Sequence, residues 1–145
     1  KKIVINAQFG GFGLSHEAEM LLAKHKGIEL YPFVDRRLEN GSFILPSSKE
    51  PRFEPYDADG PRAFLIHYST KPISVDGNYD EDSYWRSRDL PRDDPDLIRV
   101  VEELGKAANG DHATLKVVKI PNDVKFEIEE YDGLEHIAEI HRTWR

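Results

Sequence analysis

The segment KIVINAQFGGFGLSHEAEMLLAKHKGIELYPFV (residues 2–34) contains two apolar runs, with a glycine-rich turn and a periodic segment between them. The first run, Ile3 to Ile5, consists of consecutive β-branched residues, which is typical of a strand buried on both faces. The second run, residues 28–34, predicts another strand. Between the runs, Gly10, Gly11 and Gly13 favour positive φ angles and close backbone approach. The segment therefore predicts a strand, a turn, a helix and a strand in succession.

The helix of this segment is expected to begin directly after Ser15. A serine hydroxyl at that position can accept a hydrogen bond from the backbone N–H groups of the first turn. An apolar stripe at helical spacing follows, made of Leu14, Ala18, Leu21, Leu22 and His25. Lys24, Lys26 and Gly27 then predict the C-terminal end of the helix.

A strand that passes through glycines into a helix N-terminus presents unpaired amides, which suit a phosphate or a carboxylate. The candidate ligand-binding residues here are Phe9, Gly10, Gly11, Phe12, Gly13, Ser15 and His16. Asp35 lies about twenty residues further on, where a dinucleotide-binding fold places its ribose-binding acid. The match is partial, because His16 replaces the third glycine. The alternative is a tight turn whose phenylalanines fold into the core.

Composition limits the classes of function. The chain has 145 residues, no cysteine and a formal net charge of −7. This length predicts one domain, residues 1–145, and the acidic balance disfavours nucleic acid as a partner. A few local donors can still hold a small anion. With no apolar run of about 20 residues and no signal-peptide pattern, we expect a soluble cytoplasmic protein without a membrane partner.

Two irregular arms, at about residues 36–62 and 70–93, interrupt the pattern of strands and helices. Arms of this length are typical of a lid or an interaction segment, although a decorative insertion is an open alternative. The first arm contains Phe43 to Leu45, a candidate short strand preceded by an Asn40-Gly41 turn. The second combines Trp85 with Arg86, Arg88 and Arg92, as a stacked base with a phosphate would need. Alternatively, these arginines pair with neighbouring acids.

The remaining elements complete a small domain. Residues 63–68 predict a strand, and Asp94-Pro95-Asp96 predicts the start of a helix. The runs 114–120 and 124–131 predict two strands of an antiparallel hairpin. The residues from Asp132 to Glu135 fit a capping box and predict a final helix to about residue 144. The fold class is therefore α/β or α+β, with three helices against a mixed sheet of about five strands.

Other chemistry is less well supported by the sequence. The six histidines form no pair with a strong metal-binding spacing, so we expect no metal and no cofactor. Ser15 and His16 are neighbours without a nucleophile-elbow motif, so we expect no catalytic residue there. Arg142, near the end of the expected final helix, is a further candidate anion ligand.

The chain resembles a widespread family of small, mostly uncharacterised bacteriophage proteins. Three stretches carry the resemblance: residues 5–15 with the GGFGLS motif, residues 94–105 (DPDLIRVVEELG), and residues 128–144 with EEYDG and HRTW. The resemblance covers both ends and the main helix, and it implies no assigned activity. It implies a phage protein in the host cytoplasm, for which capture of a nucleotide messenger of host immunity is conceivable.

The sequence thus predicts a binding protein for a small anionic ligand, of the nucleotide class, that performs no catalysis. Its pocket would be built around residues 9–16, and the arms would close it. Two alternatives stay open. One is an enzyme acting on nucleotides through His16 or His67 with an acid, and the other is a module that contacts a host or virion protein. A homo-oligomer is compatible with each.

Overall fold

The structure is a computed structural model that describes residues 1–39, 51–74 and 80–141. The contacts within the chain divide it into two compact units. The first consists of Lys1–Lys26 and Ser87–Arg145, and the second of Gly27–Arg86. Each unit is described by itself. The expected strand 43–45, its Asn40-Gly41 turn and Arg142 lie outside the described residues.

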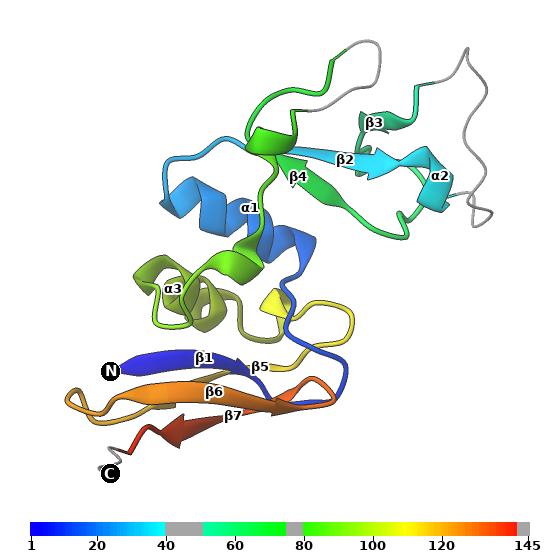
Figure 1. The fold of residues 1–145 in the computed structure, drawn as a ribbon. Coiled ribbons are helices and arrows are strands. Elements are labelled where there is room, and N and C mark those ends of the chain that lie inside the picture. The colour runs from blue at the N-terminus through cyan, green and yellow to red at the C-terminus, as the bar shows by residue number, and fades with distance from the viewer. Residues whose placement is uncertain (40–50, 75–79, 142–145) are drawn as a thin grey trace. The chain divides into compact units, whose positions relative to one another are not determined.

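The first unit contains two pairs of antiparallel strands (Figure 1). Strand β1 (Lys2–Asn6) pairs with β5 (Leu115–Lys119), so that Lys2 lies opposite Lys119 and Asn6 opposite Leu115. Strand β6 (Phe126–Tyr131) pairs with β7 (Leu134–Glu139). The expected strands at 114–120 and 124–131 are therefore confirmed, but the expectation that they pair with each other is wrong. Each has a different partner, and a distant segment provides the partner of β5.

The expected C-terminal helix is also wrong, because residues 134–139 form strand β7. Tyr131 lies opposite Leu134, so the hairpin has a two-residue loop. Its residues, Asp132 and Gly133, have φ angles of 49° and 84°. Two positive φ angles define the type I′ turn, whose right-handed twist matches that of the flanking strands and which Asp-Gly favours. The four residues from Asp132 to Glu135, which match the capping-box pattern in the sequence, thus form a hairpin turn and the start of β7.

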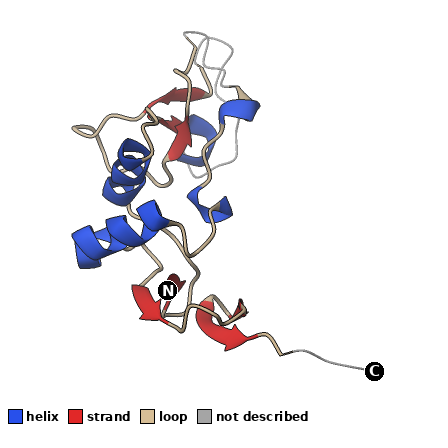
Figure 2. Ribbon diagram, turned by 90° about the vertical axis from the view of Figure 1, so that its left-hand side faces the viewer, coloured by secondary structure: helices blue, strands red, loops and turns tan. Residues whose placement is uncertain are grey.

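Two helices pack against each other in this unit (Figure 2). Helix α1 spans His16–His25 and α3 spans Pro95–Leu104. Both predicted caps are confirmed, since the Ser15 hydroxyl accepts from Ala18 N and the Asp94 carboxylate from Leu97 N. A short 3₁₀ helix, Gly105–Ala108, continues from α3. Fully buried side chains form the core, among them Ile3, Val4, Leu22, Leu97 and Val100.

One lysine links the end of α1 to the start of α3. Lys26, the C-terminal cap residue of α1, places its Nζ 2.8 Å from Asp94 and 3.0 Å from Asp96. Burial of Asp94 by itself raises its pKa, but the hydrogen bonds from Lys26 and Leu97 N and the lysine charge lower that pKa overall. The same contacts raise the pKa of Lys26. Both groups are therefore held in their charged forms.

The second unit is a three-stranded antiparallel sheet in the order β3–β2–β4. Strand β2 spans Tyr31–Asp35, β3 spans Phe53–Pro55 and β4 spans His67–Ser69. The expected strand at 63–68 therefore begins four residues later than predicted. A short helix, α2 (Arg36–Glu39), follows β2 directly. The Phe33 ring stacks on His67 at 5.3 Å and meets Phe53 edge-on at 5.7 Å, so aromatic packing holds the three strands together.

The fold class is α+β, which is one of the two classes expected from the sequence. The described residues form seven strands and three α-helices. The expected mixed sheet of five strands is not formed, because the strands lie in three small antiparallel sheets. The third helix is the short α2 rather than a C-terminal one. None of the helices in the described part of the chain is long and apolar enough to cross a membrane.

Asp94→Asn is expected to lower the free energy of unfolding at neutral pH by about 1–2 kcal/mol, because it removes the charge opposite Lys26 but keeps a good N-cap. A carboxyl group with a lowered folded-state pKa stabilises the protein above its unfolded-state pKa. That stabilisation is lost as pH falls through the folded-state pKa. The difference between parent and variant should therefore shrink from about pH 4 downward in urea denaturation.

Glu102→Gln is the matched control for this experiment. Glu102 pairs with Lys2 on the surface, where both side chains are well exposed. An exposed pair contributes about 0–1 kcal/mol, so this variant should be nearly neutral. An Asp94→Asn effect that is the same at every pH would contradict the assignment of the lowered pKa.

Candidate functional site

A cleft of about 450 Å³ lies in the first unit, where the turn after β1 meets the β6–β7 hairpin. The turn contributes residues 10–12, and Arg88 and Arg92 come from the segment that leads into α3. The hairpin contributes the rest of the lining, which is Glu130, Asp132, Gly133 and Glu135. This volume is in the range of small-molecule sites. The cleft is the candidate functional site.

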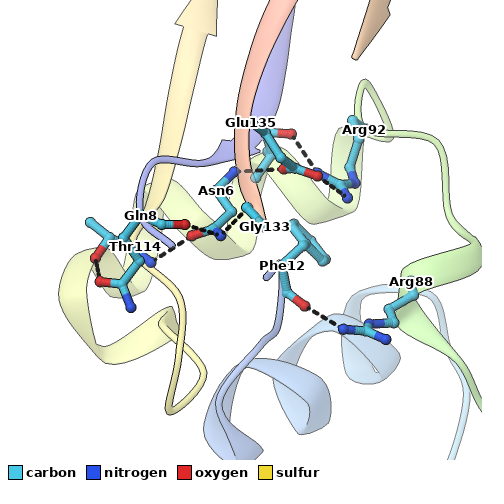
Figure 3. Close-up of polar contacts among 9 residues, drawn as sticks. Asn6, Gln8, Phe12, Arg88, Arg92, Thr114, Gly133 and Glu135 are labelled. Atoms are coloured by element: carbon cyan, nitrogen blue, oxygen red, sulfur yellow. Dashed lines mark hydrogen bonds and ion pairs between the residues drawn. The ribbon is translucent and has the colours of Figure 1, made fainter. Parts of the chain in front are cut away.

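The buried side chain of Asn6 positions the turn at the start of this cleft (Figure 3). Its Nδ2 donates to the carbonyls of Gln8 and Gly133, at 2.8 and 2.7 Å. Its Oδ1 accepts from Thr114 N at 2.9 Å. One amide group therefore joins the turn after β1, the hairpin turn and the start of β5. The Gln8 side chain supports the same junction by accepting from the Thr114 hydroxyl.

The two turns are in close backbone contact. Gly10 N donates to Asp132 O at 3.1 Å. A Cβ on Gly133 would collide with Gly11 N and would lie 2.7 Å from Gly10 C. Gly10 and Gly11 have φ angles of 122° and 118°, a region in which side chains with a Cβ are strained. The glycines at these three positions are required by the fold itself.

Gly13 differs from the other glycines of the turn. Its φ angle is not positive, and a Cβ there would meet no atom within 4 Å. Its carbonyl accepts from Gly110 N at 2.9 Å. The expectation that all three glycines of the turn supply positive φ is therefore correct for two of them only.

Arg92 is fully engaged within the protein. Its guanidinium makes two hydrogen bonds with the Glu135 carboxylate, at 2.6 and 2.9 Å. It also lies 3.7 Å from the centroid of the Phe12 ring, and Glu135 accepts from Asn6 N at 2.7 Å. Both charged side chains are largely buried. A bidentate pair of this kind leaves little of Arg92 available to an external anion.

Arg88 is the more accessible cation of the cleft. It belongs to the short 3₁₀ helix Ser87–Asp89 and is exposed. Its Nη2 donates to Phe12 O at 3.1 Å, which places the guanidinium beside the turn (Figure 3). Among the described residues, this is its single hydrogen bond. Neighbouring Ser87 is buried and donates to Glu19 at 2.6 Å, which fixes the start of this helix against α1.

Of the residues predicted from the sequence, the structure brings five together in this cleft, namely Gly10, Gly11, Phe12, Arg88 and Arg92. Ser15 is used structurally, since it caps α1 and donates to Ala107 O at 2.6 Å. His16 is half-buried, and burial lowers its pKa. Phe9 is 57% exposed and meets the exposed ring of Tyr131 edge-on at 6.4 Å.

Trp85 and Arg86 belong to the second unit. Trp85 N donates to Tyr68 O, and the Arg86 guanidinium lies over the Tyr84 ring at 5.1 Å. His67, a candidate base in the enzyme alternative, places its Nδ1 2.8 Å from the Tyr84 hydroxyl. In the described part of the chain, no cluster of three or more His, Cys, Asp or Glu side chains has a geometry that could hold a metal.

The dinucleotide interpretation of residues 2–35 is wrong. That fold needs β1 and β2 as parallel neighbours, whereas β1 pairs antiparallel with β5 and β2 lies in a different sheet. Asp35 is paired with Arg52 at 2.9 Å and accepts from Arg37 N. Although burial of Asp35 alone raises its pKa, these hydrogen bonds and charges lower it overall. The carboxylate is therefore occupied within its own unit.

Sequence reasoning missed the acidic half of the cleft and the role of Asn6. Glu130, Asp132 and Glu135 were assigned to a strand end and to a helix. The signal that would have found them is the Asp132-Gly133 pair between two alternating runs, which favours a hairpin. No local signal marks Asn6, because two of the three partners of its side chain, Thr114 and Gly133, are far away in the chain.

Comparison of the chain with known protein families, with curated proteins and with solved structures finds no match. The resemblance to phage proteins therefore stays a prediction.

Gly133→Ala is expected to destabilise the protein severely, because the new Cβ meets backbone atoms of Gly10 and Gly11 that cannot move independently. Gly13→Ala is the matched control. It should leave the free energy of unfolding unchanged or raise it by about 0.4–1 kcal/mol. Soluble yield and thermal unfolding of the two variants measure the difference. Equal stability of the two would contradict the close contact of the turns.

Glu135→Gln should lower the free energy of unfolding by about 3 kcal/mol, because it leaves the buried Arg92 without a counter-charge. The control is Glu129→Gln, at an exposed position on the same hairpin whose carboxylate lies 2.9 Å from His136 Nε2. Chemical denaturation compares the two. If Glu135→Gln costs no more than the control, the ion pair does not stabilise this unit.

Proposed function

We propose that the protein binds a small anionic ligand of the nucleotide class in the cleft between the turn after β1 and the β6–β7 hairpin, without catalysis. The observation that supports this proposal is the position of Arg88. An exposed guanidinium, with one hydrogen bond to the described part of the chain, lies beside a glycine-rich turn in a cleft of about 450 Å³. Guanidinium groups recognise phosphate and carboxylate through paired hydrogen bonds.

The backbone of the turn offers further donors beside Arg88. In the part of the chain that the structure describes, the amides of Gly11 and Phe12 donate no hydrogen bond. Each amide N–H is a strong donor that favours an acceptor. An anionic group beside Arg88 could accept from these amides as well as from the guanidinium. Arg92 contributes indirectly, since its pair with Glu135 fixes the wall of the cleft.

The wider role follows from the phage resemblance. We propose that the protein acts in the host cytoplasm and sequesters a nucleotide or a nucleotide-derived signal, as a counter-defence protein would. Binding without conversion suits this role, because sequestration needs affinity and no turnover.

A second candidate is a protein-interaction module. It is favoured by the exposed ring pair of Phe9 and Tyr131, which are 57% and 77% exposed. Aromatic side chains are enriched at protein interfaces, and exposed neighbouring rings are typical of a contact site. Co-purification with a partner that is lost in Tyr131→Ser, without any response to nucleotides, would favour this candidate.

The first experiment incubates the protein with linear and cyclic nucleotides, removes free ligand, and analyses what heating releases by chromatography. Release of the intact compound is expected. A new product would favour the enzyme alternative, and no retained compound would favour the interaction module.

Arg88→Ala tests the site with the retained nucleotide. It should weaken binding by about 1.5–3 kcal/mol, roughly tenfold to a hundredfold, because it removes a charge-assisted hydrogen bond. Arg99→Ala is the matched control, since Arg99 is exposed on α3 and pairs with Glu103 away from the cleft. Calorimetric titration measures the affinities, with thermal unfolding as the fold check. Equal affinity of both variants would contradict the proposed site.

A further inference from the structure

The cleft contains more carboxylate side chains than an anion-binding site needs. Its charged lining consists of two arginines and three carboxylates. Arg92 and Glu135 neutralise each other through their two hydrogen bonds. Arg88, Glu130 and Asp132 are the other charged residues of the lining, so the exposed part of the cleft has one positive and two negative charges. A bare phosphate would be repelled by this excess of negative charge.

The hairpin fixes the backbone at both acidic residues. Asp132 occupies the hairpin turn with a φ of 49°, and its carbonyl accepts from Gly10 N. Glu130 lies directly opposite Glu135 in the hairpin register, so both side chains are on the same face of the hairpin. Both Glu130 and Asp132 are exposed, and neither carboxylate has a partner among the residues that the structure describes.

We infer that Glu130 and Asp132 bind the hydroxyl groups of a ribose, so that the ligand is a ribonucleotide whose phosphate lies at Arg88. This inference rests on the proposed function and names the class of its ligand. Ionised carboxylates are acceptors without hydrogens, so they need a donor-bearing ligand group. A sugar diol offers two adjacent donors, and an acidic side chain is the common partner of ribose hydroxyls in nucleotide sites.

The geometry of the cleft fits a ligand with two unlike ends. Arg88 donates to the turn after β1, whereas Glu130 and Asp132 belong to the β6–β7 hairpin, and all three residues line the cleft. A nucleoside phosphate has its anionic group and its diol on the same small scaffold. The carboxylates therefore select for the sugar and oppose simple anions, which gives the cleft specificity by repulsion as well as attraction.

The experiment uses the whole chain and three probes: adenosine 5′-monophosphate, its 2′,3′-dideoxy counterpart and inorganic phosphate. Calorimetric titration should find the ribonucleotide about tenfold or more tighter than the dideoxy compound, because charge-assisted hydrogen bonds are lost. Phosphate should bind most weakly. The sugar hydroxyls are the single chemical difference between the first two probes.

The double variant Glu130→Gln with Asp132→Asn tests whether the two carboxylates bind the sugar, because it should change the affinities of the probes in different directions. It removes two negative charges without changing shape, and asparagine tolerates the positive φ of position 132. Affinity for the ribonucleotide should fall about tenfold, whereas affinity for the dideoxy compound and for phosphate should stay the same or rise. Glu129→Gln, on the opposite face of the hairpin, should change none of the three.

The possible failures can be told apart. If the dideoxy compound binds as tightly as the ribonucleotide, and Arg88→Ala weakens both, the anion site stands and the ribose assignment is overturned. The same holds if the double variant binds the ribonucleotide more tightly than the parent. If none of the three probes binds, the proposed function for this class of ligand fails and the inference fails with it.

Discussion

The buried amide of Asn6 is the interaction on which the candidate site depends. Its three hydrogen bonds join the turn after β1, the β6–β7 turn and the start of β5. A group that both donates twice and accepts is needed at this point, and a buried amide that satisfies all of them is stabilising. An apolar or purely accepting side chain would leave buried carbonyls or an N–H unpaired, each at a cost of about 1–3 kcal/mol.

The pair of Arg92 and Glu135 is the second constraint, and it decides the electrostatics of the cleft. Sequence reasoning placed Arg92 among the anion ligands because it lies in an arginine-rich arm. Its guanidinium instead lies against Phe12 and a buried carboxylate. Because the charges of this pair cancel, Arg88, Glu130 and Asp132 are left as the exposed charged residues of the cleft lining. A residue type that suits phosphate can equally be a structural cation, and burial separates the two roles.

Local features of the sequence predicted the parts of the fold that depend on neighbours in the chain. The caps at Ser15 and Asp94 and the two long helices are confirmed, because capping bonds and helical periodicity act over a few residues. The strand predicted at Ile3 to Ile5 is confirmed as part of β1 for a similar reason. The expected C-terminal helix is wrong because the residues from Asp132 to Glu135 fit two local patterns, a capping box and a hairpin turn. Pairing with β6 decides between them.

The sequence by itself determined that the fold combines helices with strands, the positions of α1 and α3, and the presence of a glycine-rich turn before α1. Only the tertiary structure decided that β1 pairs with β5, that Asp35 pairs with Arg52, and that Glu130 and Asp132 lie in the same cleft as Arg88. The physical reason is the range of the interactions. Caps and periodicity are encoded within one or two helical turns, whereas the pairing of β1 with β5 and the buried pair of Arg92 and Glu135 join residues that are 43 or more positions apart, which no local pattern specifies.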